Sequence, residues 1–145
     1  MIGLLQRVTQ AKVTVNGQAI AEIGEGLLVL VGVQKHDNTR SVKRLVERLL
    51  GYRVFADADD KMNLSVTDIK GGLLLVPQFT LAADTQKGMR PSFSSAAPPE
   101  MGEELFNELV SVARQQHDTV ATGQFGADMK VSLTNDGPVT FIITV

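Results

Sequence analysis

The chain contains no cysteine among its 145 residues. This absence excludes disulfides, thiolate metal sites and thiol nucleophiles, and it fits a reducing compartment. A surplus of positive charge is missing as well, because 14 basic residues against 16 acidic ones give a net charge of −2. A protein that grips long stretches of nucleic acid carries a positive field, so any contact with RNA should be small and local, and we expect no DNA partner.

Long hydrophobic runs are also absent. The apolar segments 27–33 and 73–76 are far too short to span a bilayer, and the apolar start of the chain is too short for a signal peptide. We therefore expect a cytoplasmic protein without membrane contact. The length fits one domain over residues 1–145, and a hydrophobic content of 43% supplies an ordinary core.

The spacing of apolar and turn residues predicts strands mixed with two helices. Asn16-Gly17 between alternating segments predicts a hairpin. An apolar stripe over residues 42–50, followed by Gly51, predicts one helix, and Pro98-Pro99 suits the first turn of another. Further strands are expected at residues 27–33, 52–55, 73–79, 120–124, 129–133 and 139–145, with a turn at 135–138. Two helices cannot cover both faces of so many strands, so we expect them on one side, with sheet packed on sheet on the other.

Three segments resemble the D-aminoacyl-tRNA deacylase family. They are residues 77–84 (PQFTLAAD), 88–93 (GMRPSF) and 135–141 (NDGPVTF), to which the opening Gln6-Arg7-Val8 can be added. The resemblance runs the whole length of the chain. It implies a single-domain α/β fold with three layers (α/β/β), mixed sheets and both main helices on one side, and a homodimer with active sites at its interface.

The resemblance also implies an activity. This is hydrolysis of the ester between a D-amino acid and the 3′ ribose of tRNA, with chiral proofreading by rejection of L-aminoacyl groups. Glycyl-tRNA is a further substrate that it implies, because glycine has no stereocentre. The partner would be the acceptor end of an aminoacyl-tRNA.

Two elements of the site follow from the matched motifs. The resemblance implies that Gln78-Phe79-Thr80 is the catalytic element and that Gly137-Pro138, joined by a cis bond, is the chiral gate. Many family members carry serine where this chain has Pro77, so a serine hydroxyl cannot be essential here. Because proline has no N–H, backbone donors to an oxyanion must come from the residues just after it.

A backbone gate suits the discrimination that the family performs. D and L substrates carry identical side chains, so the enzyme must fix the amine and the carbonyl and then block the direction of the L side chain. Rigid backbone blocks better than a side chain, which can move aside. Proline locks φ and glycine allows a close approach, so Gly137-Pro138 fits this task.

Ester hydrolysis normally uses a base, but the sequence offers a poor one. His36 and His117 both lie among polar residues, which predicts solvated surface histidines and gives little support to a Ser-His-Asp triad. Thr80 is then a nucleophile or a positioning residue, and the lack of a nearby base favours the second. We expect the N–H groups of Phe79 and Thr80 to form an oxyanion hole, with the tRNA ribose hydroxyl helping to activate water.

Five further residues each have a functional and a plain interpretation. Lys87 and Arg90 follow the catalytic element in a long loop and are expected to contact phosphates of the acceptor end, or else are solvated charges. Arg7 braces the chiral gate or forms a surface salt bridge. Phe125 and Met129 line the substrate pocket or belong to the core.

The remaining polar clusters predict no metal and no cofactor. Carboxylates are dense around residues 57–68, but the spacing of a calcium loop and its closing glutamate are missing, so we expect a solvated turn. The segment Gly24-Glu25-Gly26 lacks the lysine and hydroxyl of a phosphate loop.

Two other functions remain open at this point. One is an esterase or amidase that uses Thr80 as a true nucleophile on small metabolites. The other is a dimeric scaffold without catalysis. Residues 141–143 are apolar at the end of a strand-rich chain, so we expect them to be exposed in a monomer and buried in a symmetric dimer.

Overall fold

Eight strands and two long helices make up the fold of the computed structural model, which describes residues 1–145. In chain order they are β1 (Ile2–Val15), β2 (Gln18–Ile23), β3 (Gly26–Gly32), α1 (Thr39–Gly51), β4 (Phe55–Ala56), β5 (Met62–Leu64), β6 (Gly72–Pro77), the 3₁₀ helix η1 (Phe79–Ala82), α2 (Pro99–Gln116), β7 (Val120–Thr122) and β8 (Lys130–Thr144). The main sheet runs β2-β1-β3-β6-β7, with β8 paired along β1, while β4 and β5 form a separate ribbon. The β3–β6 and β6–β7 pairs are parallel and the pairs of β1 are antiparallel, so the sheet is mixed, as expected.

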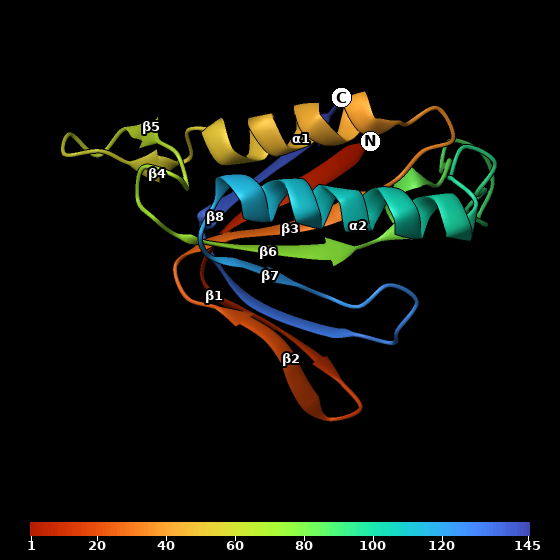
Figure 1. Cartoon of the computed structure of the whole chain (residues 1–145), viewed down its shortest axis with the longest axis horizontal. Helices are drawn as coiled ribbons and strands as arrows, with labels where there is room; N and C mark the ends of the chain where they lie inside the picture. Colours follow the sequence, from red (N-terminus) through yellow and green to blue (C-terminus); the bar gives the residue numbers. More distant parts are fainter.

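The three-layer arrangement is confirmed. Helices α1 and α2 lie next to each other over one face of the sheet (Figure 1). The first half of β1 pairs with β3 and its second half pairs with β2, so β1 passes from one β layer into the next. As a result β2 lies against β6 and β7 on the face opposite the helices.

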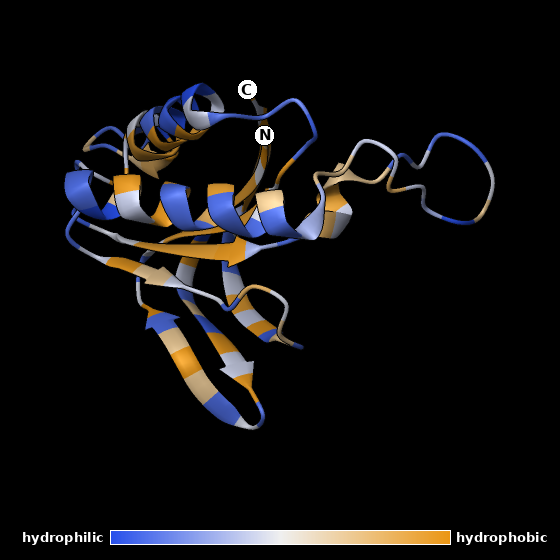
Figure 2. Cartoon of the chain, turned by 45° about the vertical axis from the view of Figure 1, so that its right-hand side comes forward, coloured by the Kyte–Doolittle hydropathy of each residue, from blue (hydrophilic) through white to orange (hydrophobic).

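Each side of the central strands has its own core. The larger core lies between the helices and the sheet, and it holds the apolar faces of both helices (Figure 2). The smaller core lies between the two β layers and includes Val8, Leu28 and Leu74. Because β3 and β6 are buried on both faces, their sequences are almost continuously apolar, as parallel central strands require. No helix is long and apolar enough to cross a bilayer.

Local sequence signals explain the elements that were expected correctly. At the start of α1 the Asn38 side chain accepts the N–H of Ser41, and the Ser41 hydroxyl accepts the N–H of Asn38, which is a capping box. Asn16 and Gly17 both have positive φ (50° and 77°) in the tight β1–β2 turn. Pro99 occupies the first turn of α2, where its missing N–H costs nothing.

Three expectations about strands were wrong in detail. Residues 129–133 and 139–145 are not two strands joined by a turn, because both segments pair with β1 as the single strand β8. The turn residues at 135–138 belong to a bulge within β8 instead. Residues 52–55 contribute only Phe55 to a strand, and the strand expected at 73–79 ends at Pro77, where the chain enters η1.

Candidate functional site

A cavity of about 520 Å³ opens where the parallel strands β3 and β6 end. We call it the pocket. Ligands in open sheets of this kind bind beyond the carboxyl ends of the parallel strands. Its wall is mostly apolar and comes from the segment after β6, the start of α2 and the segment between β7 and β8. Among the lining residues are Gln78, Phe79, Gly102, Phe106, Phe125 and Met129.

The predicted catalytic element, Gln78-Phe79-Thr80, begins where β6 stops. The N–H of Gln78 donates to the carbonyl of Val31 at 2.8 Å, and η1 starts at the next residue. The first N–H groups of a helix have no acceptor inside it, and those of Phe79 and Thr80 form none of the turn, loop or cap hydrogen bonds. The two amides are therefore free to donate to a ligand.

Side chains of the catalytic element are held from two directions. The Gln78 Nε2 donates to the Thr80 Oγ1. The ring of Phe79, which is 60% exposed, packs against that of Phe93 with 5.2 Å between centroids. Thr80 itself is exposed and does not line the pocket.

No histidine forms a hydrogen bond with Thr80, whose side chain is bonded to Gln78. His36 is exposed, as expected. The expectation for His117 was wrong: it is buried, and its Nε2 lies 2.6 Å from the carbonyl oxygen of Gly71, at the opposite end of β6 from the pocket. The chain turns inward directly after α2, which the polar residues before His117 do not reveal. The carboxylate among the pocket residues, Asp128, is exposed and paired with Lys130 at 3.1 Å.

The Gly137-Pro138 peptide bond is cis. Residues 136–139 form a bulge in β8. Gln6 pairs with Thr140 and Val8 pairs with Asn135, so only Arg7 of β1 lies opposite these four residues. The Arg7 Nε donates to the carbonyl of Asp136 at 3.0 Å, and its Nη1 donates to the carbonyl of Val54 at 2.7 Å. The guanidinium also lies 3.6 Å from the Asp136 carboxylate. Arg7 thus contacts the backbone of the bulge as well as an exposed acid.

Within one chain the predicted chiral gate, Gly137-Pro138, is far from the pocket. Arg7, opposite the gate, is in register with Leu27 of β3 and through it with Leu73 of β6. Gln78 lies five residues further along, which is roughly 17 Å at about 3.3 Å per residue. The three strand spacings from β8 to β6 add roughly 14 Å sideways. A single chain therefore does not bring the gate to the catalytic element.

Lys87 and Arg90 lie on a loop that stands out from the body of the molecule (Figure 2). Two backbone hydrogen bonds between Asp84 and Ser92, of 2.7 and 3.0 Å, close its base. Both cations are exposed and form no ion pair with the protein. Their charge is therefore available to a ligand.

The acidic stretch after α1 serves its own turns. The Asp57 carboxylate accepts the N–H groups of Lys61 and Asp59, which holds the pKa of Asp57 below its ordinary value of 3.8. Hydrogen bonds from Ser65 lower the pKa of Asp68 in the same way. These carboxylates cap loops; Asp57 is half-buried and Asp68 is exposed.

Comparison with known proteins decides the family. The model of the family described as D-Tyr-tRNA(Tyr) deacylase matches residues 4–144. The chain belongs to this family. A D-aminoacyl-tRNA deacylase of Pseudomonas fluorescens is 60% identical over 143 residues, with 99% of each chain covered. One from Proteus mirabilis is 59% identical over 145 residues, with both chains covered completely.

Two solved structures are similar to this chain in fold. A protein described as c-Myc DNA Unwinding Element Binding Protein has a TM-score of 0.96 and 38% identity, covering 100% of this chain and 99% of its own. A probable eukaryotic D-amino acid tRNA deacylase has a TM-score of 0.82 at 18% identity, covering 98% and 97%, which is a likeness of fold alone.

The sequence did not predict the part of the pocket that α2 forms in this deacylase. It identified Gln78, Phe79, Phe125 and Met129 but not the α2 residues that complete the wall. Gly102 was one signal, since a glycine early in a helix needs a reason. A Cβ at this position would meet the Phe125 ring at 3.5 Å, an ordinary contact distance, so Phe125 is the side chain that faces Gly102 in the pocket.

Proposed function

We propose that this protein hydrolyses the ester bond between a D-amino acid and the 3′ ribose of tRNA, releasing free D-amino acid and tRNA. Glycyl-tRNA is a second substrate, because glycine presents no side chain for a gate to reject. The observation that carries the proposal is the family match over residues 4–144, together with a pocket at the catalytic element. Its substrate is made and used in translation, which assigns the enzyme to the cytoplasm.

The chemistry rests on the backbone of the catalytic element. The carbonyl of the ester accepts the N–H groups of Phe79 and Thr80, which stabilise the oxyanion as water attacks. Pro77 supplies no donor, so the residues after it carry this role. The 2′-hydroxyl of the terminal ribose helps to activate the water, since no protein base lies beside the element.

Thr80 acts as a positioning residue in this mechanism. Its Oγ1 accepts a hydrogen bond from Gln78, and no histidine is hydrogen-bonded to it to take its proton. An unassisted threonine hydroxyl is a weak nucleophile. The Gln78–Thr80 pair instead holds the start of η1, and with it the two donor amides.

The complete site is formed by two copies of the chain. The chiral gate of one chain is too far from its own pocket, so it must act in the pocket of a partner. Exposed apolar surface on β8 supports such pairing: Ile142 is 68% and Phe141 is 37% exposed, whereas Ile143 is buried. A symmetric dimer that buries this surface puts the gate of each copy at the other copy's pocket.

In the dimer, Arg7 supports the gate of its own chain through its bond to Asp136. Phe125 and Met129 of the chain that supplies the pocket hold the terminal nucleoside against the apolar wall. Lys87 and Arg90 contact phosphates of the acceptor end. With a net charge of −2 the protein lacks the positive field that a duplex DNA partner would need.

The proposal is tested with three substrates at equal concentration: D-tyrosyl-tRNA, L-tyrosyl-tRNA and D-tyrosine methyl ester. We expect rapid release of D-tyrosine from tRNA only. Hydrolysis of the methyl ester at a comparable rate would identify a small-molecule esterase. No hydrolysis of any substrate by a folded sample would indicate a scaffold, and equal rates on both tRNAs would refute chiral proofreading.

A further inference from the structure

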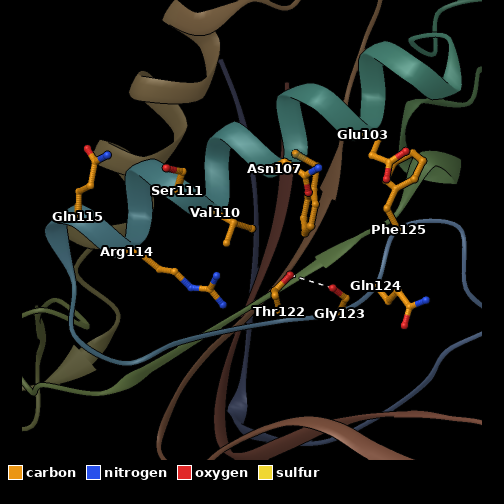
Figure 3. Close-up of a pocket in the computed structure, with 11 residues that line it drawn as sticks. Glu103, Asn107, Val110, Ser111, Arg114, Gln115, Thr122, Gly123, Gln124 and Phe125 are labelled. Atoms are coloured by element: carbon orange, nitrogen blue, oxygen red, sulfur yellow. Dashed lines mark hydrogen bonds between the residues drawn. The ribbon is translucent and has the colours of Figure 1, made fainter.

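A second cavity, of about 770 Å³, lies between α2 and β7 and meets the pocket at Phe106 and Phe125, which line both (Figure 3). We call it the α2 groove. Only three of its 11 lining residues are hydrophobic, whereas ten of the 16 that line the pocket are. It is therefore a polar extension that begins where the apolar pocket ends.

One face of α2 supplies most of the polar groups. Glu103, Asn107, Ser111 and Arg114 follow one another at three- and four-residue intervals, so they form a stripe along the helix. The 11 steps from Glu103 to Arg114 span roughly 17 Å at about 1.5 Å per residue. The segment 122–125 forms the opposite wall. The α2 groove thus leads from the pocket toward the end of α2.

The polar side chains of the α2 groove have unused hydrogen-bonding capacity. Only Thr122 forms a side-chain hydrogen bond within the protein, to the carbonyl of Gly123 at 2.9 Å (Figure 3). Arg114 takes part in no ion pair and is the only cation of the α2 groove. Glu103, its only anion, lies at the other end, beside Phe125. Free donors and acceptors in a channel of this length suit a polar, extended ligand with a negative group near Arg114.

We propose that the α2 groove binds the single-stranded nucleotides that precede the terminal adenosine of the substrate tRNA. This inference rests on the proposed function, which puts that adenosine in the pocket. The preceding nucleotides are covalently attached to it and must leave the pocket past its rim. Phe125 and the buried Phe106 line both cavities on the side of α2, so the α2 groove continues directly from the pocket.

The chemistry of the α2 groove matches single-stranded RNA. Proteins read such strands through hydrogen bonds to base edges and 2′-hydroxyls and through aromatic stacking. The amides of Asn107 and Gln124 and the hydroxyl of Ser111 can make the hydrogen bonds. Arg114 pairs with a backbone phosphate, and the Glu103 carboxylate accepts from a base amino group or a ribose hydroxyl. One cation and several neutral groups give a contact that fits the small net charge.

A different exit from the pocket would pass the loop that carries Lys87 and Arg90. No residue of that loop lines the α2 groove. Variants of the two surfaces therefore distinguish the two paths of the strand. Arg44 on α1 provides a matched control, because it is an exposed arginine whose ion pair with Glu47, at 2.7 Å, is exposed as well.

The test compares two non-hydrolysable ligands in which an amide replaces the ester: D-tyrosyl-adenosine and the D-tyrosyl-trinucleotide CCA. Wild-type protein should bind the trinucleotide more tightly than the adenosine compound. The double variant Arg114→Ala/Asn107→Ala should lose about tenfold in affinity for the trinucleotide and none for the adenosine compound. Its slope of log affinity against log salt should be shallower by about 0.7, the value for one phosphate on a single strand. Arg44→Ala should match the wild type.

Two results would overturn the inference while leaving the proposed function intact. One is equal affinity of wild-type protein for both ligands. The other is loss of the trinucleotide's advantage in Lys87→Ala/Arg90→Ala but not in Arg114→Ala/Asn107→Ala. Failure of the wild type to bind even D-tyrosyl-adenosine would instead refute the proposed function, and this inference with it.

Discussion

Replacing Phe79 with proline removes one proposed oxyanion donor without removing a structural hydrogen bond. Phe79 is the first residue of η1, a position that accepts proline. Its N–H forms none of the turn, loop or cap bonds. Gln78 before it has φ −140° and ψ 79°, outside the α region that a following proline disfavours. The variant should therefore fold.

The matched control is Phe79→Ala, which loses the same exposed ring but keeps the amide. Losing one oxyanion donor costs roughly 10²- to 10³-fold in kcat. We expect Phe79→Pro to be slower than Phe79→Ala by about that factor in single-turnover deacylation of D-tyrosyl-tRNA. Circular dichroism and thermal unfolding would verify that both variants are folded. If folded Phe79→Pro deacylates as fast as Phe79→Ala, the Phe79 amide is not an oxyanion donor.

Three further predictions follow from single contacts. Thr80→Val removes one neutral hydrogen bond, worth about 1 kcal/mol, so deacylation should slow roughly fivefold. A loss beyond about 10⁴-fold would make Thr80 the nucleophile. Gly137→Ala puts a Cβ 2.7 Å from Val139 Cγ2 and 2.9 Å from Arg7 Nη2, at a backbone φ of +131° that alanine rarely adopts. Turnover of D-tyrosyl-tRNA should therefore fall sharply, while L-tyrosyl-tRNA stays intact. Deacylation of D-tyrosyl-tRNA at the wild-type rate would refute the gate. The pKa of Asp57 is lowered on folding, so its contribution to stability is present above about pH 4 and is lost as pH falls through the folded-state pKa. In urea titrations at several pH values, the free energy of unfolding of Asp57→Asn should therefore fall less steeply with acid than that of the wild type. An unchanged pH profile would contradict this.

The helices and the first hairpin could be predicted from sequence because their signals are local. The Asn38 cap, the stripe of α1 and the Asn16-Gly17 turn each act within a few residues. Strand β8 could not be predicted as one strand, because the turn residues at 135–138 are as typical of a hairpin between two strands as of a bulge within one. Only pairing of both halves with the long strand β1 decides between them, and that contact is distant in sequence.

The site was partly predictable for a similar reason. Motif resemblance identified Gln78 and Phe79, and the structure shows them in one pocket with Phe125 and Met129. The α2 groove could not be found, because Asn107 and Arg114 have the spacing of any solvated helix face. Their meaning depends on β7 lying opposite, which comes from tertiary packing.

The central claim is that one active site uses the catalytic element of one copy and the chiral gate of the other. It is tested most directly by mixing two inactive variants, Phe79→Pro and Gly137→Ala, after unfolding and refolding them together. In a mixed dimer, one site then combines the intact catalytic element of the Gly137→Ala chain with the intact gate of the Phe79→Pro chain. We predict that D-tyrosyl-tRNA deacylation returns, approaching about a quarter of the wild-type rate for random pairing, because half of the dimers are mixed and each has one intact site. Mixed dimers as inactive as the two parents would show that the gate acts within its own chain and would contradict the account.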